Sequence, residues 1–252
     1  NTLGAQTTAI TITNVAIAIT AGQSASMAET VSSGTSTGLT VATTGDVDDN
    51  DFSITAGNTG TAFSINAASG LISTAAALDY ETLASYTLTI QVSDGTAAVT
   101  RTVAMTITDV AVTITASQSC SVAESVSSGT TCGTVSTTGD TPTMFTIGSG
   151  NTGTAFAISS AGVITTAAAL DYETTTSYTL GIVASDGTTS HGPISVTATV
   201  TDVNDQTPAV NVAATYSQAE ASATTFQTFT MVDTDTSGTY ACTLGGDDSA
   251  DF

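Results

Sequence analysis

The chain repeats itself, and this internal repetition constrains its fold more than any local pattern does. The matching stretches are residues 19–34 with 114–129, 57–63 with 150–156, and 78–81 with 170–173. Self-similarity at a nearly fixed spacing is typical of a structural unit that is used more than once. The offset falls from 95 to 92 residues along the copies, which indicates small loop deletions. The sequence therefore predicts two complete copies of one domain.

The same alignment predicts the boundaries of the copies. Residues 1–14 align with the last strand of the first full copy, so they are expected to close a preceding repeat. The first copy is predicted to span 15–109 and the second 110–205, while 206–252 open a third copy without its last part. We expect the chain to be a window on a longer tandem array. Exchange of the N-terminal strand with the unfinished copy of another molecule is an alternative, but it leaves the middle strands of that copy missing.

Within each copy, apolar side chains alternate with polar ones. In the first copy the apolar positions are Tyr86, Leu88, Ile90 and Val92, and residues 178–184 of the second copy show the same period of two. This period indicates a strand with one buried face. Threonine, serine, alanine and valine are abundant and tryptophan is absent, which favours thin sandwiches over helices. The predicted fold class is all-β, with tandem Greek-key sandwiches of about seven strands each arranged end to end.

The charge balance excludes several classes of function. Arg101 and His191 stand against 22 acidic residues, and the formal net charge is −21. Such a surface repels nucleic acid and anionic membranes and attracts cations. No apolar run approaches the ~20 residues of a membrane span. The chain has no lysine, and its single histidine is expected in a solvated hairpin loop, so we do not expect an enzyme.

Residues 201–208 read Thr-Asp-Val-Asn-Asp-Gln-Thr-Pro and follow a predicted strand. They place Asp202, Asn204 and Asp205 on an extended segment that Pro208 ends. Oxygen ligands at such positions can converge on a hard cation when a neighbouring surface closes the shell. We interpret the stretch as a calcium linker between two β domains. A solubilising acidic coat is the alternative, but all five glutamates of the chain fall at repeated positions.

Several motifs resemble, in sequence order, the calcium motifs of cadherin repeats. They are Ala-Glu-Ser at 123–125, Leu-Asp-Tyr-Glu at 170–173, Ala-Ser-Asp at 184–186, Asp-Val-Asn-Asp-Gln-Thr-Pro at 202–208 and Val-Asp-Thr-Asp at 232–235. The shorter repeat and the Thr/Ala-rich strands look more like the cadherin-like repeats of large microbial or invertebrate surface proteins than like vertebrate adhesion cadherins. The resemblance implies a Ca²⁺ junction between copies two and three. Its implied ligands are Glu124, Asp171, Glu173, Asp202, Asn204, Asp205, Asp233 and Asp235.

The junction between copies one and two departs from this pattern. Its linker lacks three residues, which correspond to the Asn-Asp-Gln of the complete linker, and Asp140 stands where an Asp-x-Asp pair is expected. The resemblance leaves a weaker ligand set here, namely Glu29, Asp79, Glu81, Asp109 and Asp186. We expect at most one ion at this junction. Apolar packing of Val110, Val112 and Ile114 is expected to replace the ion cluster of the complete linker.

Two cysteines flank the Glu124 turn. Cys120 and Cys132 occupy the positions of Ala25 and Thr37 in the first copy, on what should be neighbouring strands. A disulfide is expected between them, and two unpaired small core residues are the alternative. A disulfide in an acidic protein that resembles calcium-binding repeats indicates an oxidising, extracellular compartment.

Two functions share this predicted fold. The first is a non-enzymatic extracellular or cell-surface segment, stiffened by Ca²⁺ at its linkers, that binds other copies of itself or a cell-surface or matrix protein. The second is a subunit of an extracellular filament or surface appendage, assembled through contacts between repeats or strand exchange, with calcium secondary. Because no Asn-x-Ser/Thr sequon is present, any sugar is expected on serine and threonine hydroxyls.

Overall fold

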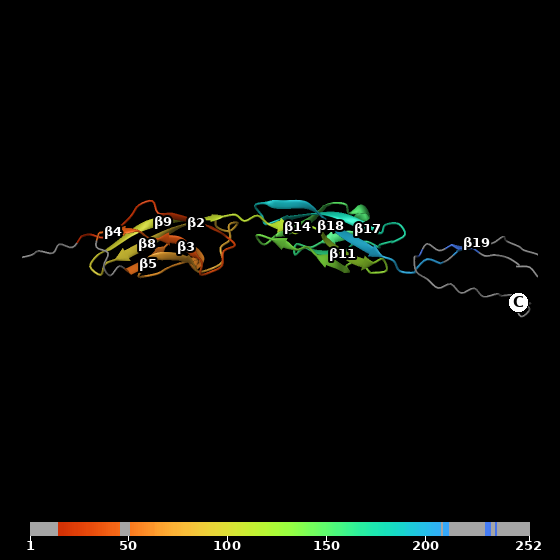
Figure 1. The fold of residues 1–252 in the computed structure, drawn as a ribbon, viewed down its shortest axis with the longest axis horizontal. Helices are drawn as coiled ribbons and strands as arrows, with labels where there is room; N and C mark the ends of the chain where they lie inside the picture. Colours follow the sequence, from red (N-terminus) through yellow and green to blue (C-terminus); the bar gives the residue numbers. More distant parts are fainter. Residues whose placement is uncertain (1–14, 46–50, 208, 212–229, 233–234, 236–252) are drawn as a thin grey trace, which may run out of the picture. The chain divides into compact units, whose positions relative to one another are not determined.

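Two β units make up most of the described chain (Figure 1). The structure is a computed structural model that describes residues 15–45, 51–207, 209–211, 230–232 and 235. One unit consists mainly of residues up to Ala111, and the other mainly of residues from Val112 onward. The strand predicted within residues 1–14 and most of the predicted third copy lie outside the described residues.

Nine strands and one short 3-10 helix form the described part of the first unit. They are β1 (Ala18–Ile19), β2 (Ser24–Ala28), β3 (Ser36–Thr40), β4 (Thr43–Thr44), β5 (Asp51–Ala56), η1 (Thr59–Thr61), β6 (Phe63–Ile65), β7 (Leu71–Thr74), β8 (Ser85–Ser93) and β9 (Ala98–Thr108). One sheet has the order β2-β9-β8-β5 and a second has the order β3-β7-β6. The two-residue strands β1 and β4 pair with each other and account for the excess over the seven strands expected.

The core of the first unit lies where the two sheets meet. On β8, the predicted face of Leu88, Ile90 and Val92 is fully buried. The ring of Phe63 on β6 meets the ring of Tyr86 on β8 edge to face, with centroids 5.1 Å apart. Because β6 and β8 belong to different sheets, this aromatic pair stabilises the sandwich across its core.

The second unit repeats this arrangement. Its strands are β10 (Thr113–Ile114), β11 (Gln118–Ala123), β12 (Thr131–Thr134), β13 (Thr137–Thr138), β14 (Met144–Ser149), β15 (Phe156–Ile158), β16 (Val163–Thr166), β17 (Ser177–Ser185) and β18 (Ser190–Thr201), with η2 (Thr152–Thr154) and a separate pair, β19 (Ala209–Asn211) and β20 (Thr230–Val232). The sheets have the orders β11-β18-β17-β14 and β12-β16-β15. The edge strand β11 runs parallel to β18, whereas β17 runs antiparallel to it.

The second core contains the apolar face predicted on β17. Leu180, Ile182 and Ala184 are fully buried, and the rings of Phe156 and Tyr178 repeat the edge-to-face contact at 5.2 Å. Val112 and Ile114, which were expected to pack at the shortened junction, are 1% and 2% exposed within this second core.

The prediction of a solvated loop around His191 was wrong. His191 lies in β18 and is partly buried, and its Nδ1 accepts a hydrogen bond from the backbone N–H of Ile114 at 3.0 Å. The following Gly-Pro pair faces the place where the register of β17 and β18 shifts, between Ile182 and Ala184. A bulge tolerates proline within a strand, so the turn-like sequence does not end β18 there.

Candidate metal centre

Glu124 is the buried centre of the site in the second unit. It follows directly after β11, and its backbone N–H donates to the carbonyl of Thr201, which extends the parallel pairing of β11 with β18 by one step. Its side chain is 6% exposed. Oε1 accepts a hydrogen bond from the backbone N–H of Val203 at 2.7 Å, and Oε2 accepts one from Tyr172 at 2.5 Å. These bonds to an ionised acceptor fix the carboxylate at the end of the sandwich.

Two overlapping groups of carboxylates form around this residue. Glu124, Glu173 and Asp202 each offer an oxygen, and these atoms lie within 4.8 Å of one another. Glu173, Asp205 and Asp235 form a second group by the same measure. Glu173 belongs to both groups. Carboxylate oxygens at these separations are the donors that Ca²⁺ prefers, so the residues present fit a hard divalent cation.

Glu173 shows the electrostatic effect of this crowding. Its side chain as a whole is exposed, but partial loss of water around the carboxyl group raises its pKa above the ordinary value of 4.5. The charges of Glu124 and Asp235 raise the pKa further. Like charges at close range disfavour the ionised form, and a bound cation removes this penalty.

Asp235 is the one described residue of its segment, and it is 6% exposed. Its Oδ2 accepts a hydrogen bond from the backbone N–H of Gln206 at 2.8 Å. The side chain of Gln206 in turn donates to Oδ1 of Asp205 at 2.8 Å. Asp235 is therefore held against the segment that follows β18, as a member of the second carboxylate group.

The first unit contains a smaller version of the same centre. Glu29 is 4% exposed, and its two oxygens accept hydrogen bonds from the backbone N–H groups of Tyr80 at 2.7 Å and Val110 at 2.8 Å. Oxygens of Glu29, Asp79 and Glu81 lie within 4.8 Å of one another. This unit thus places three carboxylates together. Burial of the Tyr86 hydroxyl raises its pKa, and the nearby charge of Asp79 raises it further.

Several expected ligands belong to none of the carboxylate groups found among the described residues. The two oxygens of Asp171 accept hydrogen bonds from the N–H and hydroxyl of Thr174. Asp109 and Asp186 also belong to none of the three carboxylate groups found among the described residues. Asn204 is exposed and lies between Asp202 and Asp205. Asp233 lies outside the described residues.

Two kinds of residue were missed by the sequence analysis. Thr166 is 2% exposed; its hydroxyl donates to the carbonyl of Ser127 at 2.8 Å and accepts from the N–H of Thr130 at 3.0 Å, which fixes the loop after Glu124. Thr74 makes the same contacts in the first unit.

Asp94 is the second kind of residue that was missed. It accepts hydrogen bonds from the N–H groups of Ala97 and Thr96, which lower its pKa. Their equivalence between copies, Thr74 with Thr166 and Asp94 with Asp186, was the available signal.

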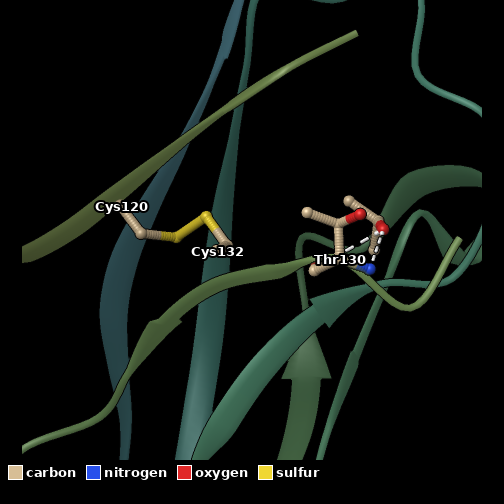
Figure 2. Close-up of a disulfide and its surroundings, with 4 residues drawn as sticks. Cys120, Thr130 and Cys132 are labelled. Atoms are coloured by element: carbon tan, nitrogen blue, oxygen red, sulfur yellow. Dashed lines mark hydrogen bonds between the residues drawn. A yellow bond between two sulfur atoms is a disulfide. The ribbon is translucent and has the colours of Figure 1, made fainter. Parts of the chain in front are cut away.

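Cys120 and Cys132 form a disulfide, which is the pairing expected from the sequence. Figure 2 shows the bond between the two strands, with Thr130 nearby on the loop that leads to Cys132. The bond closes the stretch that contains Glu124. Among the described residues, no helix is long and apolar enough to cross a membrane.

Comparison with known proteins identifies the family. The model of the cadherin domain matches residues 23–114 and 118–204. Protocadherin Fat 4 of Homo sapiens is 36% identical over 178 residues, which are 62% of this chain and 3% of that protein. The chain therefore spans a small part of this relative.

Solved cadherin structures also resemble the chain. The EC22-24 structure of mouse cadherin-23 has a TM-score of 0.44 and 20% identity, and the match covers 85% of this chain and 75% of that one. The extracellular domain of protocadherin GammaB4 has a TM-score of 0.49 and 21% identity, covering 89% of this chain and 40% of that one. Because the family model matches two successive stretches that together make up most of its length, the chain belongs to the cadherin family.

Proposed function

We propose that this chain is a calcium-stiffened segment of an extracellular adhesion protein. The observation that supports the proposal best is the sharing of Glu173 between two carboxylate groups. Through this residue, the loop after β11, the loop before β17, the segment after β18 and Asp235 all contribute oxygens to one region. A cation bound there would join these segments to one another.

A bound ion would act by removing the electrostatic repulsion between neighbouring carboxylates. Two unit charges 4 Å apart repel by roughly 4 kcal/mol at an effective dielectric constant near 20. Glu124, Glu173, Asp202, Asp205 and Asp235 would hold the ion or ions in the second unit. Ca²⁺ accepts six to eight oxygen ligands, so it converts mutual repulsion of these groups into common attraction. Glu29, Asp79 and Glu81 offer fewer oxygens, which suits one weakly held ion.

The family indicates where such a segment works. Cadherin repeats are adhesion modules of extracellular and cell-surface proteins. We propose that the partner is another copy of the same protein or a protein of the cell surface or matrix. The net charge of −21 disfavours anionic partners and favours contacts bridged by cations.

Calcium titration of the chain tests the proposal. We expect heat of binding, and protection from proteolysis, with dissociation constants on the order of 10⁻⁴–10⁻³ M, the range of extracellular modules. Asp205→Asn should weaken binding more than Asp109→Asn, because Asp205 belongs to a carboxylate group and Asp109 to none among the described residues. Absence of heat and of protection at millimolar Ca²⁺ would refute the proposal.

A further inference from the structure

The Cys120–Cys132 disulfide closes the loop that carries Glu124. Cys120 lies on β11 of the four-stranded sheet and Cys132 on β12 of the three-stranded sheet, with Cα atoms 5.4 Å apart. The bond therefore joins the two sheets at one edge of the second unit. Glu124 lies within the closed stretch, directly after β11. The backbone of Glu124 is thus part of a stretch whose two ends this covalent bond holds together.

The strand beside the disulfide is closely packed against it. A Cβ atom added to Gly133 would lie 2.9 Å from the Cβ of Cys120, closer than side chains approach one another. Only glycine therefore fits next to this bond without a shift of the strand. Both cysteines are partly exposed, so a soluble thiol can reach them.

The first unit holds the same loop without a covalent bond. Thr37 occupies the place of Cys132, and its hydroxyl donates to the carbonyl of Ile72 at 2.8 Å and accepts from the N–H of Leu39 at 3.1 Å. Strand β3 is one residue longer than its counterpart β12, and Gly38 within it takes a left-handed conformation with φ +73°. A cysteine thiol is a weaker donor and acceptor than a threonine hydroxyl. Reduction would therefore leave the loop of the second unit with fewer restraints than that of the first.

Other restraints limit how far the loop can move. The hydroxyl of Thr166 remains bonded to Ser127 and Thr130 whatever the state of the cysteines, as that of Thr74 does in the first unit. We therefore expect reduction to loosen the loop and not to unfold it.

We propose that the Cys120–Cys132 disulfide positions Glu124 for ion binding, so that thiol–disulfide exchange at this bond regulates the calcium affinity of the second unit. This inference rests on the proposed function. The reductant is a dithiol: one thiolate attacks a cystine sulfur and releases the other cysteine as a thiolate, and its second thiol then displaces the bound cysteine. Two electrons and two protons pass to the cysteines, and the dithiol becomes a cyclic disulfide. Glu124 must then be ordered when the ion binds, which weakens binding.

Hydrogen exchange of the 252-residue chain at increasing Ca²⁺ concentration tests the proposal. The Cys242→Ser background removes the third cysteine, and the chain is measured oxidised and after treatment with dithiothreitol. The calcium midpoint for protection of residues 171–176 should rise about two- to tenfold on reduction, the factor expected when one flexible side chain must be newly ordered. The midpoint for residues 79–84 of the first unit should not move, because this unit contains no cysteine.

A matched variant separates positioning from a structural role. Cys120→Ala with Cys132→Thr copies the residues of the first unit, and its midpoint should not respond to dithiothreitol. An unchanged midpoint after complete reduction, confirmed by alkylation and mass, overturns the inference while calcium binding itself remains. Exchange of Leu180 and Ile182 at the rate of an unfolded chain in the reduced, calcium-free protein also overturns it, because the bond then maintains the fold and not the site; a partial decrease in their protection is expected from the lower stability alone. Absence of calcium-dependent protection in the oxidised chain refutes both the proposed function and this inference.

Discussion

Glu124 accepts a hydrogen bond from the backbone N–H of Val203 at 2.7 Å, which ties the end of β11 to the segment that follows β18. Its second oxygen accepts from the N–H of Tyr172. Glu29 makes the equivalent pair of bonds in the first unit. One buried glutamate in each unit therefore satisfies two backbone donors from distant segments, so it stabilises the sandwich in addition to any role toward an ion.

Glu124→Gln should destabilise the second unit without calcium. A glutamine offers one carbonyl oxygen and one NH₂ group, so one of the two backbone donors would face another donor. We expect the free energy of unfolding of this unit to fall by about 1.5–3 kcal/mol, the usual effect of a hydrogen bond to a charged group. Urea unfolding followed by hydrogen exchange resolves the two units. Glu29→Gln is the mirror control: it should weaken the first unit and leave the second unchanged.

Reduction of the disulfide should lower the stability of the second unit. A bond that closes a 12-residue separation restricts the unfolded chain and stabilises the folded state by about 2–4 kcal/mol in the loop-entropy account. The urea midpoint of this unit should fall after dithiothreitol treatment, whereas the first unit has no cysteine to reduce. Equal losses in both units would point to an effect of the reagent and not of the bond.

The sequence predicted most of the core because burial leaves a period of two. Leu88 and Leu180 lie on strands whose alternate side chains are buried, as expected. Internal repetition added further information, because a residue that recurs at the same position of both copies is expected to have the same structural role in each. The pairing of Cys120 with Cys132 was predicted because they flank the Glu124 turn on strands expected to be neighbours, and the structure confirms it.

The ligand set stays a prediction, and the structure brings only some of its described residues into carboxylate groups. Asp171 and Asp79 both bond the residue three positions later, yet Asp79 lies in a carboxylate group and Asp171 does not. The two loops have the same residue spacing, so spacing alone does not predict which of these carboxylates lies close to others. His191 was misplaced for a related reason: turn-forming residues also occur at bulges within strands.

Gly150 should tolerate no side chain. Its φ is +75°, and a Cβ atom there would lie 1.8 Å from the carbonyl oxygen of Thr179. Gly150→Ala is expected to destabilise the second unit by about 3 kcal/mol or more, because it combines a left-handed backbone with a clash against β17. Gly153→Ala is the control, since Gly153 has φ +65° but no atom near the added Cβ. It should cost about 1–2 kcal/mol, the penalty of the left-handed conformation alone. Thermal or urea unfolding measures both, and equal losses would show that the contact with Thr179 does not matter.

The raised pKa of Glu173 predicts opposite pH effects with and without calcium. In the calcium-free chain, the folded state holds a proton on this carboxyl at a higher pH than the unfolded chain does. The folded state therefore binds more protons in the window between the raised pKa and 4.5, and stability increases as the pH falls through this window. Below 4.5 the group is protonated in both states, so its contribution no longer changes.

With calcium present the sign reverses, because a proton on Glu173 competes with the ion that two carboxylate groups share. Calcium affinity should fall as the pH is lowered through the same window, and the stabilisation by calcium should fall with it. Glu173→Gln should flatten the pH dependence in chelator and weaken calcium binding at every pH, since the amide cannot be ionised. Urea unfolding from neutral pH to 4.5, in chelator and in excess Ca²⁺, measures both slopes. If the stability of the calcium-free second unit rises as much between neutral pH and 4.5 in Glu173→Gln as in the unmodified chain, Glu173 is not the titrating group.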